Sequence, residues 1–133
     1  MAKPTHLLIA TAAVEGGAGL ALAIAPSALA SILLGTTLDT PAALVVARIA
    51  GAALVSLGAA CWLARKDEQS RAARGLIAAM LIYNVAAIAV FAYARIRFGL
   101  CGVGLWPAVL THVILGVWCL ACLRARANAG DSK

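Results

Sequence analysis

The sequence predicts an all-α fold: a four-transmembrane-helix bundle with a short interfacial helix between helices 1 and 2. Of its 133 residues, 64% are hydrophobic and only 12% are charged, against roughly 45–50% and about 25% in soluble domains. The mean hydropathy is +0.98. The apolar residues form four long runs, and a chain this apolar needs lipid around it. The length suits one membrane domain over residues 1–133.

Prolines bound the first two predicted spans. A span needs about 20 apolar residues to cross the hydrocarbon core of a bilayer. Residues 6–25 meet this condition, and Pro26 ends the run. Residues 42–64 form the second span and follow Pro41, a residue favoured in the first helical turn. Asp39 or Thr40 is the expected N-cap of this helix.

Two further spans and one short helix complete the expected bundle. The third span covers residues 75–94, and the fourth covers residues 106–123. Residues 27–34 are too few to cross a bilayer, so we expect a helix lying near the outer interface. Gly35 is its expected C-terminal stop. The polar tail, residues 127–133, is expected to be frayed.

The basic residues predict the orientation of the chain. The net charge is +6, and the Lys and Arg residues lie at the ends of the apolar runs. Arg95 and Arg97 fall on one side, whereas a larger set falls on the other: Lys3, Arg65, Lys66, Arg71, Arg74, Arg124, Arg126 and Lys133. The positive-inside rule therefore places both termini in the cytoplasm and the protein in the cytoplasmic membrane. A nucleic-acid partner is not expected, because the charges form no patch interleaved with aromatics.

Each predicted span carries a polar residue that hydrocarbon should exclude. These are Glu15, Arg48, Asn84 beside Tyr83, and His112. Such residues usually face a partner, a cavity or water. From the helix rise, Arg48 and His112 lie roughly 9 Å below the outer helix ends, and Glu15 and Asn84 roughly 15 Å. We therefore expect these side chains to meet in the outer half of the bundle.

Small residues share the faces of the polar ones, which is typical of close helix packing in membranes. Gly16 and Gly19 accompany Glu15, and Gly51 and Gly58 accompany Arg48. The sequence thus predicts an inward-facing ion pair between Glu15 and Arg48. Two interpretations of the polar cluster stay open. It either fixes helix register only, or forms a site for a ligand, a proton or an electron.

Neither His112 nor the cysteines predict a metal site. Metal sites usually need three or four ligands, and His112 has too few candidates near it. Cys119 and Cys122 have the spacing of a redox pair, but hydrocarbon does not favour a reactive thiolate. Cys61 lies about 220° around its helix from Arg48, so we expect it to face away from the bundle. The cysteines are expected to be small packing residues.

Several segments resemble the DoxX-like group of small four-helix membrane proteins. They are the stretch from Pro26 to Gly35, the pattern Ala47-Arg48-x-x-Gly51, the short basic loop at residues 65–74, and Tyr83-Asn84. The resemblance covers most of the chain and implies a four-helix bundle. It also implies quinone-linked or thiol-linked redox partners for some members and accessory roles for others. This chain shows no catalytic motif of that group.

A second resemblance concerns Ala13-Val14-Glu15. It is similar to the membrane-embedded glutamate in the first helix of small multidrug transporters, whose carboxylate exchanges protons for cationic drugs. Here Arg48 is expected to neutralise Glu15, and ligands would have to compete with that pair. The strong charge bias also argues against a dual-topology dimer.

The sequence alone favours a non-enzymatic accessory or interaction protein whose polar cavity binds a lipid or quinone-like ligand. Its expected partners are the bilayer and a membrane protein or a second copy. One alternative is a membrane subunit of a quinone- or thiol-linked oxidoreductase. The other is a small proton-coupled transporter that uses Glu15. No other cofactor is predicted, and the sequence has no glycine-rich phosphate loop or nucleophile–base motif.

Overall fold

The computed structural model describes residues 3–130, and the side chains of residues 3–125. This part of the chain is all-helical, which confirms the predicted fold class. Its five helices are α1 (Pro4–Ile24), α2 (Pro26–Leu34), α3 (Pro41–Ala64), α4 (Arg71–Phe98) and α5 (Leu105–Gly130). All except α2 are long and apolar enough to cross a membrane.

The helix ends follow local capping chemistry. The Thr40 hydroxyl accepts a hydrogen bond from the Ala43 N–H, 3.2 Å away, and Pro41 begins α3. Gly35 ends α2 with a φ of 73°, a left-handed conformation that suits glycine. Both features match the sequence-based expectation for this region.

Two boundaries differ from the prediction because helices extend beyond their apolar runs. Helix α4 is longer at both ends than the predicted span 75–94; Ser70 caps its start and Gly99 ends it. Helix α5 continues to Gly130, beyond the predicted end of the fourth span at residue 123 and into the segment 127–133 that the sequence predicts to be frayed. Alanine occupies positions 125, 127 and 129 and favours helix. Residues 131–133 lie outside the described part of the chain.

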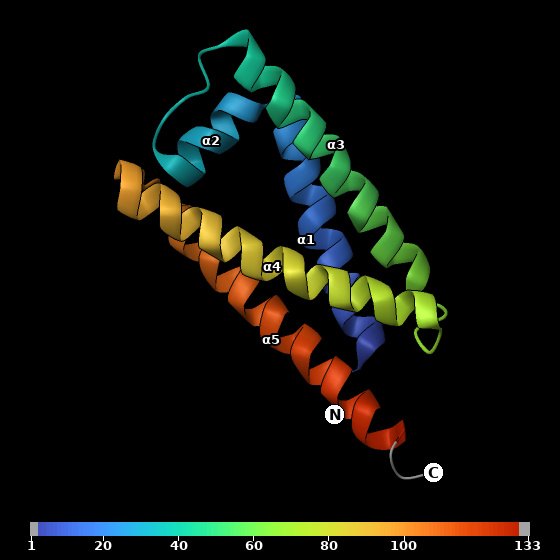
Figure 1. Ribbon diagram of the computed structural model, residues 1–133. Coiled ribbons are helices and arrows are strands. Elements are labelled where there is room, and N and C mark those ends of the chain that lie inside the picture. The colour runs from blue at the N-terminus through green and yellow to red at the C-terminus, as the bar shows by residue number, and fades with distance from the viewer. Residues whose placement is uncertain (1–2, 131–133) are drawn as a thin grey trace.

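The long helices form two antiparallel pairs, α1 with α3 and α4 with α5 (Figure 1). Backbones meet directly in the α1–α3 pair. A Cβ added to Gly19 would lie 2.7 Å from the Gly51 carbonyl oxygen, and one added to Gly58 would lie 2.9 Å from the Gly16 nitrogen. The small residues therefore permit a contact that larger side chains would prevent.

The two pairs are joined at both ends of the bundle. At one end, Gly102 N–H donates to the Leu33 carbonyl at 3.1 Å, and Gly104 N–H donates to the Ile32 carbonyl at 2.8 Å. These bonds hold the end of α2 against the loop between α4 and α5. At the other end, the Thr5 hydroxyl of α1 donates to the Glu68 carboxylate, in the loop between α3 and α4.

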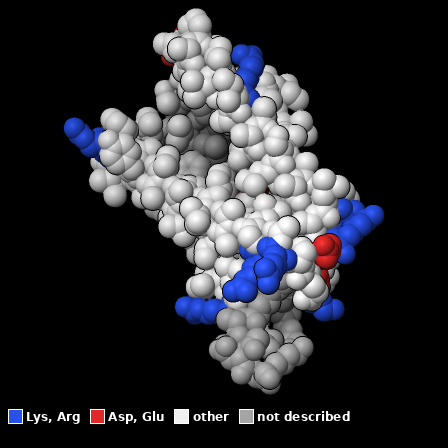
Figure 2. All heavy atoms as spheres, turned by 45° about the vertical axis from the view of Figure 1, so that its right-hand side comes forward, with Lys and Arg blue, Asp and Glu red and all other residues white. Residues whose placement is uncertain are grey.

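The surface suits a lipid environment. Large apolar side chains on the long helices are exposed, including Ile24, Val46, Ile82 and Val117. Figure 2 shows Lys and Arg gathered toward the ends of the molecule, with uncharged surface between them. Exposed apolar surface of this extent is rare in soluble monomers. Burial inside the protein is correspondingly limited to a small central core.

Candidate ligand-binding cavity

A cavity of about 300 Å³ lies between the two helix pairs. All five helices contribute to its wall, and α2 contributes Leu29 and Leu33. The remaining lining residues are Val14, Glu15, Ala18, Leu22, Leu54, Tyr83, Phe91, Ala108, Thr111 and His112. Figure 2 shows the molecular surface hollowed in its upper half. The cavity is thus mostly apolar, with a few polar side chains from α1, α4 and α5.

Glu15 is buried at the wall of this cavity, with 1% of its surface exposed. The Tyr83 hydroxyl of α4 donates a hydrogen bond to its carboxylate. The other carboxylate oxygen, Oε1, has no hydrogen-bond partner among the described residues. Thr11 lies one turn earlier on α1, and its buried hydroxyl also has no partner there. The bundle therefore buries a carboxyl group that is only half satisfied.

Arg48 does not pair with Glu15, so the predicted inward-facing ion pair is wrong. The Arg48 side chain is exposed and does not line the cavity. Gly51 and Gly58 form the face of α3 that meets α1. Three residues turn a helix by about 300°, which leaves Arg48 about 60° away from Gly51. A backbone-to-backbone seam is narrow, and this offset is enough to put a long side chain outside it.

Asn84 and His112 join α4 to α5 behind the cavity wall. The Asn84 side-chain Nδ2 donates to the Met80 carbonyl at 2.7 Å, and its Oδ1 lies 2.9 Å from His112 Nδ1. Asn84 is fully buried and His112 is 8% exposed. The structure thus places Glu15, Tyr83 and His112 around one cavity and Asn84 in contact with His112, and their role in binding a ligand stays a prediction.

Aromatic rings fix the position of the His112 imidazole. The Tyr83 ring stands edge-on to it, with centroids 5.7 Å apart, and the Phe91 ring lies 6.0 Å from it. Sequence reasoning missed Phe91, although it lies seven residues after Asn84 and therefore on nearly the same face of α4. Nothing in an apolar run distinguishes such a phenylalanine from a lipid-facing one.

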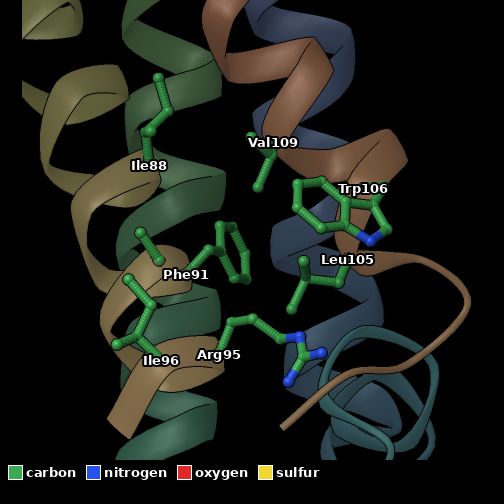
Figure 3. Close-up of a pocket in the computed structure, with 8 residues that line it drawn as sticks. Ile88, Phe91, Arg95, Ile96, Leu105, Trp106 and Val109 are labelled. Atoms are coloured by element: carbon green, nitrogen blue, oxygen red, sulfur yellow. The ribbon is translucent and has the colours of Figure 1, made fainter. Parts of the chain in front are cut away.

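Phe91 also lines a second, smaller groove of about 150 Å³ between α4 and α5. In Figure 3 its ring points into this groove, which Ile88, Val109 and Trp106 border and which the Arg95 side chain reaches. Arg95 is exposed. The Phe91 ring is thus shared between an outward-facing groove and the inner cavity.

The cysteines are distributed differently from the prediction. Cys61, Cys119 and Cys122 are all buried in one hydrophobic core cluster, whereas Cys101 is exposed. The expected separation of about 220° between Cys61 and Arg48 is compatible with the structure, but Arg48 is the outward residue and Cys61 the inward one. None of the four forms a disulfide within the described part of the chain. The described residues contain no group of three side chains placed to hold a metal ion.

Comparisons with protein-family models, with curated proteins and with solved structures found no match. The resemblance to the DoxX-like group therefore stays a prediction from the sequence.

Proposed function

We propose that this multi-pass protein resides in the cytoplasmic membrane and binds a lipid-soluble molecule, a quinone-like compound or a lipid, between its two helix pairs. The observation that carries the proposal is the cavity itself. It combines apolar walls with a few polar groups, among them Glu15, Tyr83 and His112. Ligand sites typically have this composition and volumes of about 300–1,000 Å³.

The position of the polar groups supports an amphipathic ligand. Leu22, Leu29 and Leu33 line the same cavity as Glu15 and His112, so one ligand can meet both kinds of surface. Ionisable residues within a membrane bundle are expensive, which makes them functional candidates by default. The ligand's apolar part would contact the leucines and its polar head would contact Glu15 or His112.

Its biological role is proposed as that of an accessory or interaction protein. The chain carries no recognised catalytic motif, and its partner is a membrane protein or a second copy. The termini are proposed to be cytoplasmic, because most Lys and Arg residues lie at the span ends that adjoin the two termini and the loop at residues 65–74.

Purification in a mild detergent tests ligand binding directly. Wild-type protein should retain a lipid-soluble molecule detectable by extraction and mass spectrometry, and should bind a decyl-substituted benzoquinone or the corresponding hydroquinone in a titration. Ala108→Phe places a ring into the cavity and should abolish both results. Leu110→Phe is the matched control, because Leu110 lies on the same helix with 59% of its surface exposed. Absence of any bound molecule in wild-type protein, or unchanged binding by Ala108→Phe, would refute the proposal.

One observation favours a second function, proton-coupled transport through Glu15. This carboxyl group lines the cavity and has no cationic partner among the described residues. Arg48, whose side chain is exposed, therefore does not compete with a ligand for this carboxylate. In proteoliposomes with a pH-sensitive dye inside, a transporter should move protons when a lipophilic cation is added, and Glu15→Gln should stop this movement. Equal proton movement in empty liposomes would remove this alternative.

A further inference from the structure

The hydrogen bonds around the cavity leave its polar end rich in acceptors. Glu15, Tyr83, Thr111 and His112 are the polar side chains in its wall. Where the hydrogen of each of these groups is already used in a hydrogen bond within the protein, the group can only accept a hydrogen bond from a ligand. This restricts the head group that the cavity can bind, because a buried acceptor left without a donor is costly.

His112 uses its Nδ1 hydrogen within the protein. The Asn84 Nδ2 group donates to the Met80 carbonyl, so Oδ1 must be the atom that faces His112. An amide oxygen can only accept, and His112 Nδ1 must therefore carry the hydrogen. In the neutral ring, Nε2 is then a bare acceptor. Nε2 is also the only ring nitrogen left to meet a ligand.

Tyr83 and Thr111 also use their hydrogens internally. The Tyr83 hydroxyl donates to Glu15. The Thr111 hydroxyl donates to the Pro107 carbonyl, one turn earlier on α5, at 2.9 Å. Both oxygens keep only lone pairs for any further contact. Glu15 Oε1 is buried without a partner, and even a protonated Glu15 would add a single donor to this end.

We propose that the ligand's head group donates hydrogen bonds, through hydroxyl or ammonium groups, rather than accepting them through carbonyl groups. This inference rests on the proposed function and narrows it. A quinone-like ligand is bound as the quinol, whose hydroxyl hydrogens match the acceptor Nε2 of His112 and the oxygens of Tyr83 and Thr111. The quinone carbonyls would face acceptors instead. Asn84 is a positioning residue in this arrangement, since it acts only through the His112 ring.

The test compares three probes on the full chain in detergent: decyl-hydroquinone, decyl-benzoquinone and decylamine. The hydroquinone should bind about tenfold more tightly than the benzoquinone, because one or more hydrogen bonds separate the two. Decylamine shares the donor chemistry, and its rank against the hydroquinone identifies which kind of donor the site prefers. Equal or tighter binding of the benzoquinone would overturn the inference but leave the proposed function standing. If none of the probes binds, the proposed function fails with it.

Variants of Asn84 test the hydrogen-bond chain. Asn84→Leu removes the acceptor for His112 Nδ1 and should bring the hydroquinone-to-benzoquinone affinity ratio toward one. Asn84→Asp keeps an acceptor and should preserve most of the preference. Val85→Ala is the control on the neighbouring, exposed position. Nitrogen-15 NMR of labelled histidine gives a readout that needs no ligand: it should show hydrogen on Nδ1 and none on Nε2 of His112. Hydrogen on Nε2 would contradict the inference even if folding of the variants were impaired.

Discussion

Glu15 has a hydrogen bond from Tyr83 but no cation beside it within the described chain. A buried polar group that is only partly satisfied lowers stability. Replacing Glu15 with Gln keeps an oxygen for Tyr83 and removes the chance of a buried charge. We expect Glu15→Gln to raise the free energy of unfolding by about 1 kcal/mol, measured by titrating detergent-solubilised protein with a denaturing detergent. A clear loss of stability would mean that the carboxylate has a favourable partner.

Arg48 leads to a separate prediction about coupling. Because its side chain is exposed and Glu15 is buried, the two residues should contribute independently to stability. The changes caused by Glu15→Gln and Arg48→Met should add to within about 0.5 kcal/mol in the double variant. The same unfolding titration measures all four proteins of this cycle. An interaction energy well above that limit would show that Glu15 and Arg48 do form an ion pair.

These residues show which parts of the site the sequence could predict. An intramembrane Glu, Asn or His has little choice but to turn inward, so their placement followed from cost alone. Arg48 has a long side chain and lies near the N-terminal end of α3, where such a side chain can extend toward the interface. The free-energy cost of burying a charge in hydrocarbon therefore does not force Arg48 to turn inward. Phe91 is apolar, and only the structure distinguishes it from lipid-facing neighbours.

At the scale of elements, the α1–α3 pair depends on glycine contacts. A Cβ on Gly19 would lie 2.7 Å from both the Gly51 oxygen and the Val55 nitrogen. These atoms belong to backbone and cannot move aside without separating the helices. Gly19→Ala should therefore lower the free energy of unfolding by roughly 1–3 kcal/mol, in the same unfolding titration.

Gly17→Ala is the matched control for this contact. Gly17 lies two residues away on the same helix, and a Cβ there would meet nothing within 4 Å. Its replacement should leave stability unchanged or slightly higher, because alanine favours helix more than glycine does. Equal destabilisation by both variants would show that helix α1 itself, rather than its packing on α3, is sensitive.

The element boundaries separate what local sequence determines from what it does not. Pro41 with Thr40, and Gly35, mark helix ends through backbone chemistry that can be read directly. Helix α4 extends past its apolar run because polar residues such as Arg71 and Arg97 also tolerate helix. Hydropathy reports which part of a helix lies in lipid, whereas the helix itself ends at a cap.

At the scale of the whole molecule, the cavity results from how the two helix pairs are joined. Contacts are close within each pair and fewer between pairs. The α2–loop hydrogen bonds connect the pairs at one end, and the Thr5–Glu68 contact connects α1 to the α3–α4 loop at the other. A hydrophobic core cluster that includes Leu8, Ile77 and Cys119 fills the space between the pairs on the side of the α3–α4 loop, and the cavity remains on the side of α2. No local sequence pattern encodes this space, because it depends on helices that are distant in the chain.

The orientation of the whole molecule can be tested with its own cysteines. Cys101, in the loop between α4 and α5, is exposed, whereas Cys61, Cys119 and Cys122 are buried. With cytoplasmic termini, a membrane-impermeant maleimide added to intact cells should label the protein once, at Cys101, and Cys101→Ser should remove the label. Gln69→Cys in that background places a thiol in the loop between α3 and α4, at an exposed position. It should react only after the cells are permeabilised. The reverse pattern would show that the loop after α3 faces outward, against the direction that the Lys and Arg distribution predicts.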